Sequence, residues 1–199
     1  MSADPPLDRR RVAIAGHTGD TETARSGLAS PDPGVRATAL GALERLGELE
    51  ARELRAACTD QSPAVRRRAA EVAARHPEVD LLPLLGDAEP MVIETAAWAA
   101  GEHEDDRGAL VERLIDLAGQ HDDALVREAA VAALGAIGSD AGRAAILSAL
   151  TDKPAVRRRA VLALAPFAGN DVDAAIERSL ADRDWQVRQA AEDLRRAMR

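Results

Sequence analysis

The sequence predicts an all-α fold in which about six similar helix pairs stack on one another. A pattern of Val, Arg and Ala-rich residues recurs along the 199-residue chain at nearly constant spacing. Aromatic residues make up only 2% of the chain, so the core must be built from Ala, Leu, Val and Ile. This composition suits closely packed helices better than sheets, which favour aromatic and β-branched residues.

The recurring unit starts with an acidic residue, usually followed by Pro, and continues with Val-Arg and an Ala-rich run that often closes with Gly. The pattern aligns six valines that stand 27 to 34 residues apart: Val35, Val65, Val92, Val126, Val156 and Val187. Apolar residues four, seven and eleven positions after each valine share one side of a helix with it. Pro33, Pro63, Pro90 and Pro154 stand where this helix begins, the position at which the missing N–H of proline costs nothing.

A second helical pattern precedes each Val-Arg segment. In "DRGALVERLIDLAG", for example, apolar residues recur at Val111, Leu114, Ile115 and Ala118. Each unit of about 30 residues is therefore expected to be helix–turn–helix. A single unit cannot bury its apolar face alone, so the units must stack. Pro83 in the first helix of the third unit predicts a break or bend there.

The segments "GDTETARSGLASPDPGVRATALGALERLG" and "DDALVREAAVAALGAIG" resemble HEAT repeats, in particular the short form also found in phycobilin lyases. The resemblance covers about residues 19–198. It implies a right-handed α-solenoid of about six two-helix repeats. Residues 19–199 are then expected to form one domain, with residues 1–18 as an N-terminal segment and capping helix. The resemblance says little about function, because such repeats serve as scaffolds, adaptors, lyases and, in a diverged branch, DNA glycosylases.

An arginine follows the aligned valine in five units: Arg36, Arg66, Arg127, Arg157 and Arg188. A row of arginines suits phosphate binding, but it also suits a structural ladder, because the guanidinium fork bridges turns well. We favour the ladder, as the resemblance implies for these arginines. The expected partners are aspartates near the adjoining turns: Asp32, Asp60, Asp87, Asp123, Asp152 and Asp184.

Positions two, five, six and nine after each valine are expected to point away from the core. The resemblance implies that the second helices line a concave binding face. The predicted apolar centre of this face comprises Trp98, Val131, Val161 and Leu162. The predicted mixed-charge rim comprises Arg67, Glu94, Glu128 and Arg158. An exposed Trp among small residues is typical of an interface hot spot. The alternative is that Trp98 fills space between helices, and we expect Trp185 to be a packing residue.

Candidate catalytic and metal sites are weak in this sequence. The four histidines fall at expected helix ends, and no Ser/His/Asp arrangement can be assembled from the pattern. "EHEDD" (102–106) and "HDD" (121–123) contain metal-ligand residue types, but they lie at opposite ends of a helix expected over 105–120, about 22 Å apart. Asp105 and Asp106 instead suit a helix N-terminus. We therefore expect no metal and no cofactor.

The charge balance argues against nucleic acid as a partner. The net charge is −8, and phosphate backbones need clustered positive charge. "RRR" occurs three times, at 9–11, 66–68 and 157–159. Arg67, Arg68, Arg158 and Arg159 could lie near the groove, with Trp98 between them as a base-stacking surface. Interleaved glutamates and the lack of aromatic residues oppose that arrangement.

No stretch of the chain is apolar enough to span a membrane, and Cys58 has no partner for an intrachain disulfide. A cytoplasmic protein is the expectation, and the oligomeric state is left open. We predict a non-enzymatic protein-interaction scaffold or adaptor. The alternative is a lyase-like or DNA-glycosylase-like protein that acts on a bilin or a nucleic acid.

Overall fold

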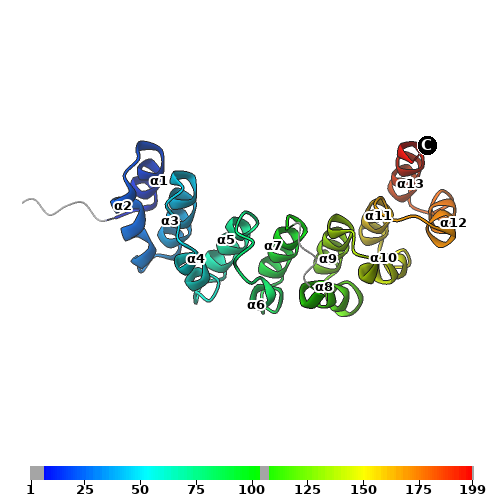
Figure 1. Ribbon diagram of the computed structural model, residues 1–199, viewed down its shortest axis with the longest axis horizontal. Helices are drawn as coiled ribbons and strands as arrows, with labels where there is room; N and C mark the ends of the chain where they lie inside the picture. The colour runs from blue at the N-terminus through cyan, green and yellow to red at the C-terminus, as the bar shows by residue number, and fades with distance from the viewer. Residues whose placement is uncertain (1–6, 104–107, 199) are drawn as a thin grey trace, which may run out of the picture. The chain divides into compact units, whose positions relative to one another are not determined.

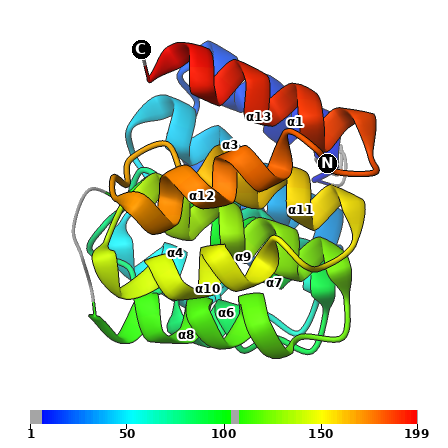
Figure 2. The same ribbon diagram turned by 90° about the vertical axis from the view of Figure 1, so that its right-hand side faces the viewer.

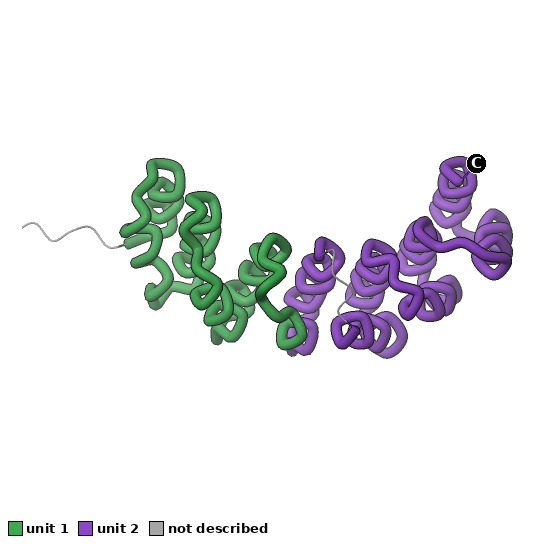
Figure 3. Tube along the Cα trace, in the orientation of Figure 1, with its two compact units in different colours: residues 1–84 green, residues 85–199 purple. Residues whose placement is uncertain are grey.

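The computed structural model describes residues 7–103 and 108–198, in which helices are joined by short turns and loops (Figure 1). Thirteen α-helices, two short 3-10 turns and no strands occur in this part of the chain. The predicted α-solenoid of two-helix repeats is thereby confirmed. The helices divide into two compact units, residues 1–84 and 85–199 (Figure 3).

Unit 1 consists of a capping helix followed by two complete helix pairs. Its helices are α1 (Arg9–Thr18), α2 (Thr21–Ser26), α3 (Pro33–Leu46), α4 (Ala51–Ala57) and α5 (Pro63–Ala73), with a 3-10 turn at Gly27–Ala29. Helix α3 packs against α1 on one side and α5 on the other. The core at the start of the unit joins α1, α2 and α3 through Val12, Ala24 and Leu43.

Unit 2 is built from helix pairs of the same kind. Its helices are α7 (Pro90–Gly101), α8 (Gly108–Gln120), α9 (Ala124–Ile137), α10 (Arg143–Ala149), α11 (Pro154–Ala163), α12 (Asn170–Ser179) and α13 (Trp185–Ala197), with a 3-10 turn at Asp140–Gly142. The second helices α7, α9, α11 and α13 pack in sequence along one layer, and α8 packs against α10 in the other. Figure 2 shows α8, α10 and α12 from the side, one above another.

The second helices begin where the proline pattern predicts. Pro occupies the start of α3, α5, α7 and α11, and the six aligned valines are all buried. An aspartate side chain caps three of these helices by accepting a backbone N–H: Asp32 on α3, Asp123 on α9 and Asp184 on α13. Gly47 and Gly138 end α3 and α9 with positive φ, which glycine adopts without strain.

The first helices are shorter and less regular than the second ones. Pro83 lies in α6 (Leu82–Leu85), which has four residues and spans the boundary between the units. The predicted break at Pro83 is therefore present as a helix of a single turn. Asp105 and Asp106, the expected start of the 105–120 helix, lie outside the described residues, and α8 is described from Gly108.

Small residues let the second helices of unit 2 approach closely. A Cβ placed on Gly101 would lie 3.3 Å from Cα of Ala133, and one placed on Gly135 would lie 2.6 Å from Cα of Ala163. The backbones of α7, α9 and α11 therefore pack almost directly on one another. None of the helices in residues 7–103 and 108–198 is long and apolar enough to cross a membrane.

Candidate protein-binding surface

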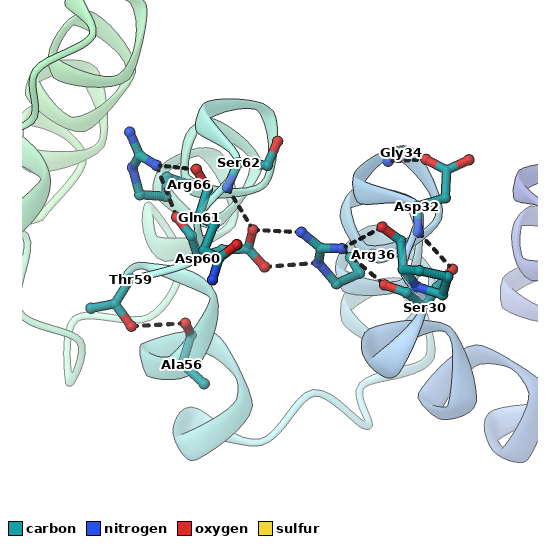
Figure 4. A network of polar contacts seen from close by, with 11 residues as sticks. Ser30, Asp32, Gly34, Arg36, Ala56, Thr59, Asp60, Gln61, Ser62 and Arg66 are labelled. Carbon is teal, nitrogen blue, oxygen red and sulfur yellow. Dashed lines mark hydrogen bonds and ion pairs between the residues drawn. The ribbon is translucent and has the colours of Figure 1, made fainter.

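Paired ion bridges connect the turns of successive repeats. Arg36 donates through Nε and Nη2 to both carboxylate oxygens of Asp60, at 2.8 and 2.7 Å (Figure 4). In unit 2, Arg127 makes the same bidentate contact with Asp152, and Arg157 makes it with Asp182. In each pair the arginine's hydrogen bond holds the pKa of the aspartate below its ordinary value, although partial burial opposes this effect.

The same arginines also bind the turn that precedes their own helix. Nη1 of Arg36 donates to the carbonyls of Ser30 and Pro31, and Nη1 of Arg66 donates to those of Asp60 and Gln61 (Figure 4). Arg127, Arg157 and Arg188 repeat this contact five or six residues back. Each arginine therefore closes its own turn, and Arg36, Arg127 and Arg157 also bridge to the next one.

The structural interpretation of the ladder agrees with these contacts, but three of the six expected partners need correction. Asp60 and Asp152 are bridging partners as expected. Asp32, Asp123 and Asp184 instead accept backbone N–H groups of their own helices, because they stand immediately before the first helical residue. Asp182, two residues earlier, bridges in place of Asp184. Asp87 accepts the N–H of Glu89.

The exposed side of the second helices in unit 2 carries large apolar side chains. Trp98 on α7 is 49% exposed and Leu162 on α11 is 40% exposed, and both stand six residues after the aligned valine. Exposed Met91 precedes Trp98 by seven residues, so the two side chains lie on the same side of α7. Exposed Leu125 holds the position of Met91 on the neighbouring helix α9. Sequence reasoning missed Met91 and Leu125, although the seven-residue spacing was a usable signal.

The placement of Val131 and Val161 on this surface was wrong. Both side chains are 0% exposed. Gly135 follows Val131 by four residues, so both lie on one side of α9, and that side faces Ala163 of α11. The position five residues after the valine therefore contacts the following helix. Val161 lies in the same position on α11, which packs against α13. A binding role for these two side chains is withdrawn.

The predicted rim residues keep at least part of their surface exposed. Glu94, Glu128 and Arg158 are half-buried in unit 2, and Arg67 is exposed on α5 of unit 1. Glu128 lies 3.5 Å from Nη2 of Arg159 rather than pairing with Arg158. Within the described ranges, neither Glu94 nor Arg158 forms an ion pair. The carboxylate of Glu94 and the guanidinium of Arg158 are therefore available for ion pairs with a binding partner.

Trp185, which we expected to be a packing residue, is 64% exposed. It is the first residue of α13, and the prolines in this position on α3, α5 and α11 are also exposed. Pro90, in the same position on α7, is partly buried, so the exposure of this position depends on what lies beside each helix start. The two tryptophans of unit 2 thus occupy different surfaces: Trp98 in the middle of a second helix and Trp185 at a helix start.

Reactive groups are held in structural contacts. The protonated ring of His76 donates to a carboxylate oxygen of Glu44 at 2.7 Å and to one of Glu78 at 3.1 Å. Partial burial opposes its protonation, but these hydrogen bonds prevail and raise its pKa. Burial raises the pKa of the Cys58 thiol to about 11, so it remains protonated at neutral pH. In the part of the chain that the structure describes, no three His, Cys, Asp or Glu side chains gather as metal ligands do.

Known proteins resemble this chain in repeat pattern and fold. Residues 21–88, 78–165 and 111–195 match the HEAT-repeat family. A designed armadillo repeat protein in complex with the peptide (KR)4 is 20% identical, with a TM-score of 0.68 over 90% of this chain and 100% of that one. A second designed armadillo repeat protein is 21% identical, with a TM-score of 0.63 over 88% and 98%. YibA of Escherichia coli is 19% identical, with a TM-score of 0.64 over 96% and 75%. No curated protein matches the chain.

Proposed function

Because the chain belongs to the HEAT-repeat family, we propose that it is a non-enzymatic scaffold whose second-helix face binds another protein. The observation that carries the proposal is the apolar group on α7, α9 and α11: Met91, Trp98, Leu125 and Leu162. Large apolar side chains grouped on the surface of a soluble domain mark interaction sites more often than isolated ones do.

Trp98 is the proposed anchor of this surface. A half-exposed indole offers a large apolar area and loses few rotatable bonds when a partner covers it. Interface residues of this kind carry most of the binding free energy in many complexes. The helix pairs hold the side chain on a rigid support, so that binding orders few groups of the scaffold.

Glu94 and Arg158 are proposed to orient the partner. Glu94 stands four residues before Trp98, so the two side chains are neighbours on α7. A basic residue of the partner beside Glu94 would place an adjoining apolar side chain on the indole. The proposed partner is therefore a protein segment with an apolar residue next to a Lys or Arg. The designed armadillo repeat protein that binds (KR)4 offers a precedent for peptide binding by this fold.

The two tryptophans permit a direct test with matched variants. Peptides selected from a random library for binding to the wild-type protein are titrated against Trp98→Ala and Trp185→Ala. Trp98→Ala should weaken binding by at least about tenfold, as expected for a hot-spot residue, and Trp185→Ala by less than about twofold. In a Trp185→Phe background, the emission of Trp98 should shift to shorter wavelength when peptide is added. Equal affinity of both alanine variants would refute the proposed surface.

A further inference from the structure

A basic hollow lies between α1, α3 and α5 of unit 1. Its volume is about 320 Å³. Arg9 and His17 of α1, Arg45 of α3 and Arg68 of α5 line it, together with small residues that include Gly41. The lining, as far as the described residues show it, contains no Asp or Glu. A chain with a net charge of −8 thus brings guanidinium groups from three helices to one place.

Gly41 makes room for one of these guanidinium groups. A Cβ placed on Gly41 would lie 2.9 Å from Cζ and 3.1 Å from Nε of Arg68. The guanidinium of α5 therefore rests directly on the backbone of α3. A glycine inside a helix is less favourable than an alanine. The close contact with the guanidinium of Arg68 explains why a glycine occupies position 41.

Gly16 does the same for Arg45. A Cβ on Gly16 of α1 would lie 3.0 Å from Nη1 of Arg45 and 2.8 Å from Cα of Ala42. Arg68 has one acidic neighbour, Glu71, at 2.7 Å. Arg9 and Arg45 form no ion pair within residues 7–103 and 108–198. The basic charge of the hollow therefore exceeds the acidic charge in contact with it.

We propose that this hollow binds the phosphate group of a monoester. A guanidinium donates in a planar fork that matches phosphate oxygens. A phosphate monoester carries a charge of about −1.5 to −2 at pH 7 and three strong acceptor oxygens. Arg9, Arg45 and Arg68 line the hollow from three helices, so that more than one guanidinium group is available to a bound phosphate. The site lies in unit 1 and does not depend on the proposed function of the second-helix face in unit 2.

Isothermal titration calorimetry with inorganic phosphate and with a phosphoserine peptide tests the proposal, with the unphosphorylated peptide as a blank. Arg68→Gln and Arg45→Gln should each weaken phosphate binding by about tenfold, the loss expected for a charge-assisted contact. Arg10→Gln removes the same charge from an exposed position of α1 outside the lining. It should change the affinity by less than about twofold.

Gly41→Ala tests the geometry without removing a charge. The three atoms nearest to the added methyl group all belong to the guanidinium of Arg68, the mobile end of a long side chain. The fold should therefore be retained while the guanidinium is displaced. Circular dichroism and thermal unfolding check the fold. The expected result is a wild-type unfolding transition together with about a tenfold loss of phosphate affinity.

Inorganic phosphate and the phosphoserine peptide distinguish a site for free phosphate from a site for a phosphorylated protein. Equal binding of inorganic phosphate and the phosphoserine peptide would support a site for the phosphate group alone, and tighter binding of the peptide would support a phosphoprotein as its carrier. The proposal fails if Arg10→Gln weakens binding as much as Arg68→Gln. It also fails if neither probe binds the wild-type protein at millimolar concentration.

Discussion

Arg157 donates to both carboxylate oxygens of Asp182, at 2.9 and 2.7 Å, across 25 residues of sequence. Its Nη1 also donates to the carbonyl of Asp152 at 2.8 Å, and Asp152 in turn accepts from Arg127. One side chain thus joins the start of its own helix to the turn of the next repeat. The side chain of Arg157 is only 6% exposed, against 13% for Arg127. Its removal therefore leaves a partly buried carboxylate without its partner.

Arg157→Gln should lower the free energy of unfolding by about 2 kcal/mol, because a charge-assisted bidentate contact is lost and Asp182 remains. Urea denaturation measures the difference. Arg158→Gln is the matched control, since it removes the same charge one residue later from a half-buried side chain, and it should cost less than about 0.5 kcal/mol. Equal losses in the two variants would contradict the bridging role.

Acid should destabilise the fold through the same bridges. The pKa of Asp182 lies below its ordinary value of 3.8 because Arg157 donates to the carboxylate, and the pKa values of Asp60 and Asp152 are shifted in the same direction. A lowered pKa in the folded state stabilises the protein above the unfolded-state value, and this contribution is lost as the pH falls through the folded-state pKa. The free energy of unfolding should therefore decline below about pH 4, and less steeply in Asp182→Asn.

His76 should produce the opposite dependence on pH near neutrality. Its pKa lies above the ordinary 6.5, since hydrogen bonds to Glu44 and Glu78 outweigh the effect of partial burial. A raised pKa in the folded state stabilises the protein fully below the unfolded-state pKa, and this stability is lost as the pH rises through the folded-state value. Urea unfolding should show lower stability at about pH 8 than at about pH 6. In Glu44→Gln this difference should shrink, and an unchanged difference would exclude the pair as its cause.

Val131 and Trp98 should differ in their response to alanine substitution. Val131→Ala should lower the free energy of unfolding by about 1–3 kcal/mol, because the side chain, on α9, is fully buried. Trp98→Ala should cost less than about 1 kcal/mol, since half of the indole is exposed. Thermal unfolding of the two variants checks this order, and the reverse order would contradict a larger contribution of Val131 than of Trp98 to the packed core.

Two helical glycines should respond to alanine with opposite signs. A Cβ on Gly135 would lie 2.6 Å from the backbone of Ala163, so Gly135→Ala must push α9 and α11 apart and should cost about 1–3 kcal/mol. A Cβ on Gly119 would meet no atom within 4 Å, so Gly119→Ala in α8 should stabilise the protein by about 0.5–1 kcal/mol. Denaturation midpoints distinguish the two effects.

The repeat itself was fully visible in the sequence. The aligned valines mark the buried side of each second helix, and the prolines mark four of the helix starts. Both patterns can be recognised from the sequence because they depend only on residues within one helix. The exposure of Trp98 followed from the same periodicity. The turn-closing arginines were also predictable as a class, since each one stands at a fixed distance from its own turn.

Contacts between helices were decided by the tertiary structure alone. Helical periodicity shows on which side of α9 the side chain of Val131 lies, but it does not show which side of α9 packs against α11. The close approach of Gly135 to Ala163 decides this. The choice of Asp182 over Asp184 likewise depends on where the next turn lies in space. Arg9, Arg45 and Arg68 stand far apart in the sequence, and only the packing of α1, α3 and α5 brings them around one hollow. A single chain's periodicity describes one helix at a time, whereas a binding site is made by the packing of several.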